Sequence, residues 1–358
     1  MRGLLQLWQI QGNRGTAMSR LDFKNGVIEM GHGSGGKTSA TLIEELFVRH
    51  FDNALLDQGN DQAAFNVLAG RMVVSTDGHV ITPLFFPGGD IGALSVHGTI
   101  NDVAMSGATP LYLSASFILE EGFPLAGLER IVISMAKASK AAGVPVVTGD
   151  TKVVERGKGD GVFITTTGIG IVPEGINISG NQAMPGDILI VSGSIGDHGI
   201  AILSSRESLQ FGTNIESDSA ALHTLVANMV GVAPHIHCLR DPTRGGLATT
   251  LNELARQSKV GMRIQETAIP MKAEVKGACE LLGLDPLYIA NEGKLVCIVP
   301  AAHADELLST MKKHPLGRDA AIIGTVCEDA QQMVVMETAF GGNRVVDWLA
   351  GEQLPRIC

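Results

Sequence analysis

The sequence predicts an α/β (α+β) protein made of two mixed domains of similar size, followed by a short C-terminal tail. The chain has 358 residues, and at roughly 100–200 residues per domain this length suggests two domains. Runs of β-branched residues and segments of helical spacing occur in both halves. A polar, glycine-containing stretch at residues 173–186 separates the halves.

Strands and one amphipathic helix make up the recognisable part of the first half. Residues 72–76 form an apolar run that ends at Asp77, and residues 125–142 carry apolar side chains at helical spacing before Gly143, a typical helix end. The other predicted strands of this half are 111–119, 144–147 and 162–172.

The second half repeats this mixture without a clear internal sequence repeat. Its predicted strands are 187–191, 294–299 and 321–326, and its predicted helices are 219–230 and 245–257. We therefore expect a disordered extension at 1–28, an N-terminal domain at 29–175, a C-terminal domain at 176–347 and a mobile tail at 348–358. Gly351 and Pro355 forbid a continuous helix in that tail.

Composition excludes several classes of function. The net charge is −10 and no basic stripe occurs, which argues against nucleic-acid binding. No run approaches the ~20 apolar residues of a membrane span, and the N-terminus lacks a signal peptide. The five cysteines are widely spaced and form no CxxC pair, so we expect a reducing cytoplasm. Four of them read as small core residues, and the fifth, Cys358, ends the chain.

A glycine-rich segment at residues 31–38 matches the phosphate-binding pattern GxxxxGK[ST]. A P-loop must follow a buried strand, but residues 27–30 are few and include Glu29. We expect instead a flexible segment that covers a phosphate with its backbone amides and with Lys37. Gly33, Gly35 and Gly36 belong to this candidate site. A true P-loop and a plain glycine loop are the alternatives.

Five aspartates and one asparagine share one setting, near apolar runs and most of them beside glycine or asparagine. Mg²⁺ prefers such hard oxygen ligands, and a magnesium ion would relieve the repulsion between carboxylates and ATP phosphates. Each residue taken alone is more typical of a turn or cap than of a metal ligand, and it is their shared setting that favours a site. The candidates are Asp61, Asp77, Asn101, Asp102, Asp150 and Asp241.

Two further polar residues are candidates for catalysis. Lys152 follows Gly149-Asp150-Thr151, where its charge could meet a phosphate or an oxyanion, although a solvated surface lysine is the simpler interpretation. Glu292 lies between apolar runs, where a carboxylate is costly unless it has a task. It could be a general base or a turn glutamate.

The terminal Cys358 combines a thiol with the α-carboxylate of the chain end, which tends to raise the pKa of a thiol. It does not form a prenylation box, since that motif places its cysteine four residues from the end. An exposed thiol is open to oxidation. We therefore expect a working group that carries substrate, with an accidental terminal residue as the alternative.

Taken together, these motifs resemble the HypE family of hydrogenase-maturation proteins, within the wider family of aminoimidazole-ribotide synthetase-like ATP enzymes. The resemblance covers residues 29–358, and its most specific part is the terminal Pro355-Arg356-Ile357-Cys358. The remaining motifs are His32-Gly33-Ser34-Gly35-Gly36, Asn60-Asp61-Gln62-Ala63-Ala64, Ser75-Thr76-Asp77, Thr99-Ile100-Asn101-Asp102-Val103-Ala104, Thr148-Gly149-Asp150-Thr151-Lys152-Val153, Asp241-Pro242-Thr243-Arg244-Gly245-Gly246 and Asn291-Glu292-Gly293.

The resemblance implies a fold that periodicity alone does not fix. Each half would be an α/β domain, and the N-terminal sheets of two subunits would pair into a barrel-like homodimer. ATP would lie in a cleft between the domains, capped by the glycine-rich segment. The tail ending in Cys358 would be flexible.

The resemblance also implies an activity, that of an ATP-dependent carbamoyl dehydratase of the lyase type. Cys358 would receive a carbamoyl group from the carbamoyltransferase HypF, and ATP would phosphorylate the carbamoyl oxygen. Loss of phosphate and a proton would leave a thiocyanate. Its cyano group would pass to iron on the HypC–HypD complex, as the cyanide ligand of a nickel–iron hydrogenase.

The same resemblance assigns roles to the candidate residues. Glu292 would remove the amide protons, and Lys152 would stabilise the transferred phosphoryl group or orient the amide. Metal and phosphate would be held by Asp61, Asp77, Asp102 and Asp241, and Asn101 and Asp150 would line the nucleotide site. The role of Lys37 stays open because Lys37-Thr38 departs from the family pattern.

Three other functions compete with this interpretation. Selenophosphate synthetase would need a cysteine near the glycine-rich segment, but none precedes Cys238. A P-loop NTPase switch would need Lys37 and not Cys358. A docking scaffold would bind partners without turning over ATP.

Overall fold

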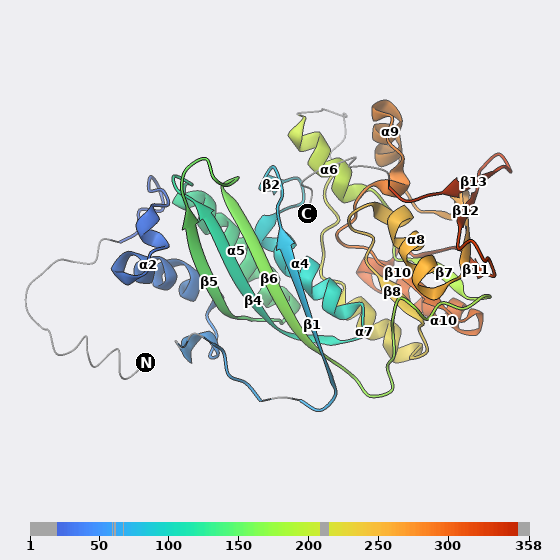
Figure 1. Ribbon diagram of the computed structural model, residues 1–358, viewed down its shortest axis with the longest axis horizontal. Coiled ribbons are helices and arrows are strands. Elements are labelled where there is room, and N and C mark those ends of the chain that lie inside the picture. The colour runs from blue at the N-terminus through green and yellow to red at the C-terminus, as the bar shows by residue number, and fades with distance from the viewer. Residues whose placement is uncertain (1–19, 59, 61, 67, 208–214, 350–358) are drawn as a thin grey trace, which may run out of the picture.

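The computed structural model describes residues 20–58, 60, 62–66, 68–207 and 215–349. Within them the chain forms a four-stranded sheet and a seven-stranded sheet, each covered by helices. Figure 1 shows the first sheet beside the second, with the helix α2 (Gly36–Leu42) on the side far from the C-terminal half. The predicted pair of mixed α/β domains is confirmed.

The N-terminal sheet has the order β1-β6-β4-β5, where only β4 and β5 are parallel. All four of its predicted strands are present: β1 (Arg71–His79), β4 (Thr109–Glu120), β5 (Val146–Val154) and β6 (Val162–Val172). Two strands run further than expected. Asp77 and the run from Gly149 to Lys152 lie inside strands, whereas the sequence placed them just after strand ends.

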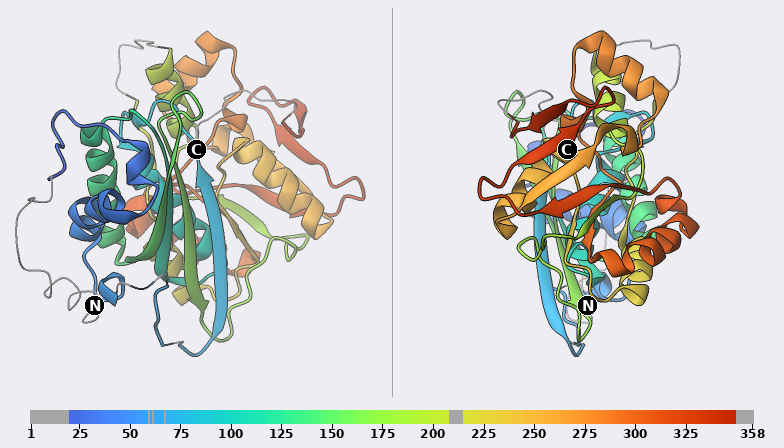
Figure 2. Two further views of the ribbon diagram at one scale, coloured as in Figure 1. Left: turned by 60° about the vertical axis from the view of Figure 1, so that its left-hand side comes forward. Right: turned by 90° about the vertical axis from the view of Figure 1, so that its right-hand side faces the viewer.

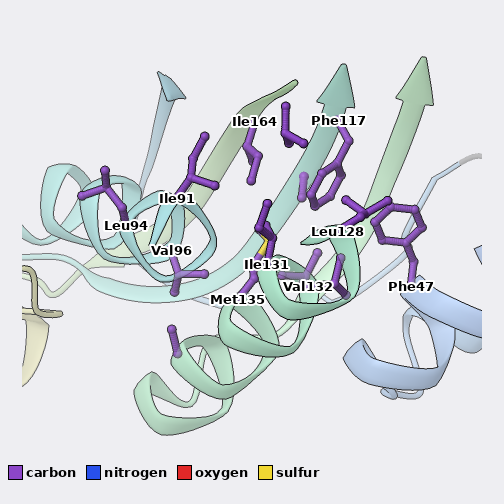
Figure 3. Packing of buried hydrophobic residues seen from close by; sticks show 14 of the residues in the cluster. Phe47, Ile91, Leu94, Val96, Phe117, Leu128, Ile131, Val132, Met135 and Ile164 are labelled. Atoms are coloured by element: carbon purple, nitrogen blue, oxygen red, sulfur yellow. The ribbon is translucent and has the colours of Figure 1, made fainter. Parts of the chain in front are cut away.

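The helices α4 (Ile91–Ala104) and α5 (Leu125–Ala142) pack on one face of this sheet. Figure 3 shows Leu128, Ile131 and Met135 of α5 packed towards Phe117 of β4. The bounds of α5 are those predicted, and it ends at Gly143 with φ 69°. The helix α4 was missed because apolar or small residues surround it on most sides, so it has no polar stripe.

Two glycines of β6 let α4 approach the sheet closely. A side chain at Gly170 would meet the Val103 methyl at 2.5 Å, and one at Gly168 would meet Thr99 at 2.8 Å. At its start, Asp90 caps α4 by accepting hydrogen bonds from the amides of Gly92 and Ala93. This packing fixes Asp102, in the last turn of α4, beside β1.

The segment before β1 covers the edge of the sheet at β5. It contains η1 (Met30–His32), α2, the π-helical η2 (Ile43–Val48), α3 (Arg49–Phe51) and η3 (Leu56–Gln58), and the short pair β2 (Phe85–Phe86) and β3 (Gly89–Asp90) follows β1. The described part of the expected extension is structured. Val27 bridges to Pro124 and Ile28 is fully buried, so residues 20–28 pack on this domain.

The C-terminal sheet has the order β13-β12-β9-β11-β7-β10-β8, in which only β12 and β9 are parallel. Its strands are β7 (Ile188–Val191), β8 (Cys238–Arg240), β9 (Gly261–Gln265), β10 (Val296–Val299), β11 (Ala321–Cys327), β12 (Val334–Glu337) and β13 (Asn343–Val346). Its helical elements are α6 (Asp197–Arg206), α7 (His223–Val232), α8 (Gly246–Ser258), η4 (Glu266–Ala268), α9 (Ala273–Leu282), η5 (Pro286–Tyr288), α10 (Ala301–Lys313) and η6 (Pro315–Gly317).

Alternate residues of β7 and β10 point to two apolar layers. Leu189 packs with α8, while Ile190 packs with α7 and α10 on the other face. The predicted helices α7 and α8 and strands β7, β10 and β11 are confirmed, with ends shifted by a few residues. The short strands β8, β9, β12 and β13 and the helices α6, α9 and α10 were not predicted.

The opposite face of the N-terminal sheet carries no helix, as the views in Figures 1 and 2 show. Met72, Val74 and Ile118 lie on it and are well exposed, at 46%, 58% and 39%. The sheet is open in this single chain, so the expected barrel-like pairing stays a prediction. Among the described residues, no helix is long and apolar enough to cross a membrane.

Candidate active site

The glycine-rich segment forms a tight turn against the edge strand β5. Gly33 lies so close that a Cβ there would come within 2.5 Å of the backbone nitrogen of Val153. Gly35 and Gly36 have φ values of 79° and 76°, which side chains rarely adopt. Ser39 fixes the turn, because its hydroxyl accepts from the Gly35 amide and donates to the Gly31 carbonyl.

This turn is not part of a P-loop fold. The residues before it contribute one isolated bridge, Val27 to Pro124, and no parallel strand precedes the turn among the described residues. Lys37 is exposed at the start of α2. The match to the P-loop pattern therefore reflects glycine conformation and not the P-loop fold.

A cavity of about 240 Å³ opens between the glycine turn and β5. Its wall includes Gly33, Gly35, Asp150 and Lys152. Apolar side chains also line it: Ile43, Phe47, Val48, Phe51, Leu56 and Phe117. An apolar lining with a few polar groups at its rim is typical of a site for a small organic ligand.

Lys152 and Asp150 form an ion pair on β5, with the ammonium nitrogen 2.7 Å from the carboxylate Oδ2. Both side chains are more than half exposed, so the pair contributes little to stability. The hydrogen bond from Lys152 lowers the pKa of the Asp150 carboxyl. In this pair each charge is neutralised until a ligand separates them.

A second group of acidic side chains lies at the junction of the two domains. Asp77 is on β1, and Asp102 on α4 accepts a 2.8 Å hydrogen bond from the Ser75 hydroxyl. Burial raises the pKa of Asp102 although the Ser75 hydrogen bond lowers it, and the charge of Asp77 adds to the rise.

The C-terminal domain contributes Asp241, directly after β8, and Glu292, shortly before β10. Burial, and next the charge of Asp102, raise the pKa of Asp241 to about 7. Burial raises the pKa of Glu292 well above its usual value, and the charges of Asp241 and Asp218 raise it further. Carboxylates from both domains therefore repel one another across this junction.

Glu292 is the most unusual member of the group. It is 4% exposed, and its Oε1 atom is buried without a hydrogen-bond partner among the described residues. A buried carboxylate without a partner is costly. This cost favours a functional group over a turn residue, the two interpretations that the sequence left open.

No three acidic, histidine or cysteine side chains of the described residues are close enough to hold a metal ion. The chemistry of the group nevertheless suits one. Asp77, Asp102 and Asp241 supply hard oxygen atoms. Burial raises the pKa values of Asp102 and Asp241 most, and the charges of neighbouring carboxylates, which a bound cation would offset, raise them further. Asp61, the fourth predicted ligand, lies outside the described residues.

Asn101 occupies the junction but its amide is already engaged. The amide nitrogen donates to the carbonyls of Ala220 and Glu292, and the amide oxygen accepts from the Leu222 amide at 2.7 Å. In this arrangement Asn101 ties the domains together. Its predicted contact with a nucleotide would need these bonds to be exchanged.

The structure separates the predicted residues into two groups. Register places Asp77, Thr166, Ala115 and Gly149 in one row across the sheet. At ~4.8 Å per strand, the backbones of Asp77 and Gly149 are therefore about 14 Å apart. The glycine turn lies at the β5 edge, away from the C-terminal domain (Figure 1). The expectation that it caps an interdomain cleft does not hold within one chain.

The Lys152 side chain and the acidic group also lie on opposite faces of the sheet. Lys152 pairs with Ile118, which is exposed, while its neighbour Val153 pairs with the buried Leu119. Asp77 lies on the helix-covered face, where Gly98 of α4 approaches its carboxylate. Alternation along the strands therefore turns Lys152 to the open face.

Cys358 lies outside the described residues.

Two residues beside Glu292 were not predicted from the sequence. Asp218 accepts a hydrogen bond from the Glu292 amide, and Lys294 pairs with Asp218 at 3.1 Å. No spacing signal could have found this contact, because it joins residues that are 74 positions apart. A lysine at the start of an apolar run, two residues after Glu292, was the only hint in the sequence.

Comparison with known proteins identifies the family. Two family models match, the N-terminal domain of AIR synthase related proteins over residues 59–172 and the C-terminal domain over residues 184–337. The carbamoyl dehydratase HypE of Cupriavidus necator is 69% identical over 339 residues, which is 94% of this chain and 97% of that protein.

The chain belongs to the HypE family. A crystal structure of a HypE in complex with ATP has a TM-score of 0.89 at 52% identity, and the match covers 92% of this chain and 99% of that one. HypE in a HypE–HypF complex has a TM-score of 0.77 at 50% identity, with 86% and 99% covered. HypE relatives therefore share both sheets of this fold, and one of them binds ATP.

Proposed function

We propose that the chain is an ATP-dependent carbamoyl dehydratase acting in hydrogenase maturation, which converts a carbamoyl group on its own Cys358 thiol into a thiocyanate. The observation that carries this proposal is the buried carboxylate of Glu292 at the acidic junction, whose Oε1 atom has no hydrogen-bond partner among the described residues. A carboxylate whose pKa is raised is a stronger base than an ordinary one. Proton removal from a weakly acidic amide needs such a base.

The chemistry requires the amide oxygen to become a leaving group. The carbamoyl oxygen attacks the γ-phosphorus of ATP, and ADP departs. The C–O bond then breaks and phosphate leaves with the former carbamoyl oxygen. One amide proton passes to Glu292 and the other leaves with the phosphate, so that a C≡N bond forms on the sulfur. The sum is loss of one water at the cost of one ATP.

The other predicted residues would bind and orient the nucleotide. The cavity beside Gly33 and Gly35 has room and apolar surface for part of a nucleotide. Lys152 would leave Asp150 to meet the transferred phosphoryl group. Asp77, Asp102 and Asp241, with Asp61, would hold a magnesium ion, which when bound neutralises phosphate charge.

The open face of the N-terminal sheet supports the proposed homodimer. It exposes apolar side chains at Met72, Val74 and Ile118 and has no covering helix. Lys152 lies on this face, while Glu292 lies beyond the other face in the C-terminal domain. We infer that pairing of two chains lets Lys152 of one chain serve the acidic junction of its partner.

Partners follow from the proposed reaction. The carbamoyl group would come from a HypF-type carbamoyltransferase, a proposal supported by the solved HypE–HypF complex. The cyano group would pass to iron on a HypC–HypD complex. These encounters would take place in the cytoplasm, where the cysteines of the described residues, all free thiols, stay reduced.

The test is the intact mass of the full chain after carbamoylation by a HypF-type enzyme. With ATP and magnesium we expect each carbamoylated chain to lose the mass of one water and to yield one ADP. The Cys358→Ser variant is expected to take up no stable carbamoyl group. A carbamoylated chain that keeps its mass while ATP is hydrolysed would contradict the proposal.

A further inference from the structure

Residues 215–222 form an interdomain segment that is held from both sides. On the N-terminal side, the Ser217 amide donates to the Pro87 carbonyl, and the Ser219 hydroxyl lies 3.0 Å from Nδ1 of His97. On the C-terminal side, the Ser217 hydroxyl lies 2.8 Å from Nδ1 of His198. These bonds fix the backbone of this segment between α4 and α6.

Asp218 projects from the centre of this segment into the C-terminal domain. Its side chain is 3% exposed, and both carboxylate oxygens have partners. Oδ1 accepts the Glu292 amide at 3.1 Å, and Oδ2 pairs with the ammonium group of Lys294 at 3.1 Å. The fit is tight, because a side chain on Gly293 would collide with the carbonyl oxygen of Asp218.

The backbone of Glu292 is thus held at both ends of one residue. Asp218 binds its amide, and the Asn101 side chain donates to its carbonyl at 3.2 Å. By contrast, no group holds the Oε1 atom of the Glu292 carboxylate, which lacks any hydrogen bond among the described residues. Its position is therefore set through its backbone, by groups that do not touch the carboxylate.

The cost of burying Asp218 argues that this contact has a purpose. A buried ion pair is weak evidence for stability, because desolvation offsets most of the attraction between its charges. Here the negative Asp218 also stands near the negative Glu292, which adds repulsion. A neutral residue would avoid that repulsion. An acidic residue that holds the backbone of another acidic residue is expected where position matters more than stability.

We propose that Asp218 is a positioning residue for Glu292: by holding the Glu292 amide and the Lys294 ammonium, it aims the Glu292 carboxylate at the reacting amide. This inference rests on the proposed function, in which Glu292 is the base. In this role Asp218 would act through Glu292, without contact to ATP or the carbamoyl group. A small displacement of a catalytic group is enough to reduce a rate about 100-fold.

The experiment follows the single-turnover dehydration of the carbamoylated full chain by mass, at a series of ATP concentrations. We expect Asp218→Ala to lower the maximal rate about 10- to 100-fold without changing the ATP concentration that gives half of that rate. Asp218→Asn keeps an oxygen that can accept from the Glu292 amide, and it is expected to restore most of the loss. Asp305→Ala, at an exposed site on α10, is the control.

A double variant separates positioning from general damage. If Asp218 acts through Glu292, Asp218→Ala adds no loss to Glu292→Gln, whereas independent effects would multiply. Multiplied losses, an unchanged rate in Asp218→Ala, or no rescue by Asp218→Asn would each overturn the inference. A fully active Glu292→Gln would instead overturn the proposed base. If Asp218→Ala does not fold, Asp218→Ser, which leaves a shorter side chain, takes its place in the same comparison.

Discussion

At the scale of single residues, Glu292 links the chemistry to the stability of the chain. Its carboxylate is buried without a partner for Oε1 and faces Asp241 and Asp218. In the unfolded chain the same carboxyl would ionise near pH 4.5. Above pH 4.5 the folded chain therefore keeps a proton that the unfolded chain has lost. The contribution of Glu292 to the free energy of unfolding is full at low pH and is lost as the pH rises towards the folded pKa.

Glu292→Gln removes this cost together with the base. We expect the thermal midpoint of the variant to exceed that of the wild type at pH 7 and to match it near pH 4, both measured with a chelator present. Dehydration of the carbamoylated chain is expected to fall about 10²- to 10⁴-fold. Glu306→Gln, at an exposed site on α10, is the control for both measurements. A Glu292→Gln variant that is less stable at pH 7 would contradict this account of its environment.

At the scale of elements, the contact between the glycine turn and β5 can be tested with two matched glycines. A Cβ on Gly33 would meet the backbone of Val153 at 2.5 Å, whereas one on Gly31 would meet Thr38 at an ordinary 3.6 Å. We expect Gly33→Ala to cost about 1–3 kcal/mol of stability and to weaken ATP binding, measured by denaturant unfolding and calorimetry. Equal effects of Gly31→Ala and Gly33→Ala would show that the close approach is unimportant.

The helix α4 contacts the interdomain segment through His97. Burial, and next repulsion from His223, lower the pKa of His97 to about 4. In the unfolded chain its pKa is about 6.5, so the folded chain resists protonation. The contribution of His97 to the free energy of unfolding is therefore full above pH 6.5 and is lost as the pH falls towards 4. We expect His97→Asn to remove at most about 3 kcal/mol of this pH dependence, measured by urea unfolding at several pH values. An unchanged slope between pH 4 and 6.5 would count against it.

Of the two helices on the N-terminal sheet, the one with a face on solvent was predictable and the enclosed one was not. The polar stripe of α5 marked its ends, but α4 is apolar or small on most sides and gives no helical period. Likewise Asp77, Asp102, Asp241 and Glu292 stood out as acidic residues near apolar runs, and the structure brings them to one junction. Asp218 escaped notice because only the folded chain brings it to Glu292. The separation of Lys152 from this acidic group depends on strand register, which the sequence does not reveal.

At the scale of the whole molecule, one chain cannot place Lys152 at its own acidic junction. The two groups lie on opposite faces of the N-terminal sheet and at its opposite edges. A homodimer through the open face would solve this problem by combining Lys152 of one chain with Glu292 of the other. The catalytic unit would then be the dimer, and dissociation would abolish turnover.

Mixing two inactive variants tests this arrangement. Lys152→Ala and Glu292→Gln chains are each expected to be inactive as homodimers. After subunit exchange, half of the dimers are mixed and each holds one intact site, so about a quarter of the wild-type activity should return. No recovery despite proven exchange would show that Lys152 and Glu292 act within one chain.

The central claim is that ATP activates the carbamoyl oxygen for departure as phosphate. The most direct measurement places a heavy oxygen isotope in the carbamoyl group on Cys358 and follows it by mass spectrometry after ATP is added. The account predicts that the label appears in the released inorganic phosphate, with one labelled phosphate for each thiocyanate formed. Label that remains on the protein or appears in water, while unlabelled phosphate is released, would contradict it.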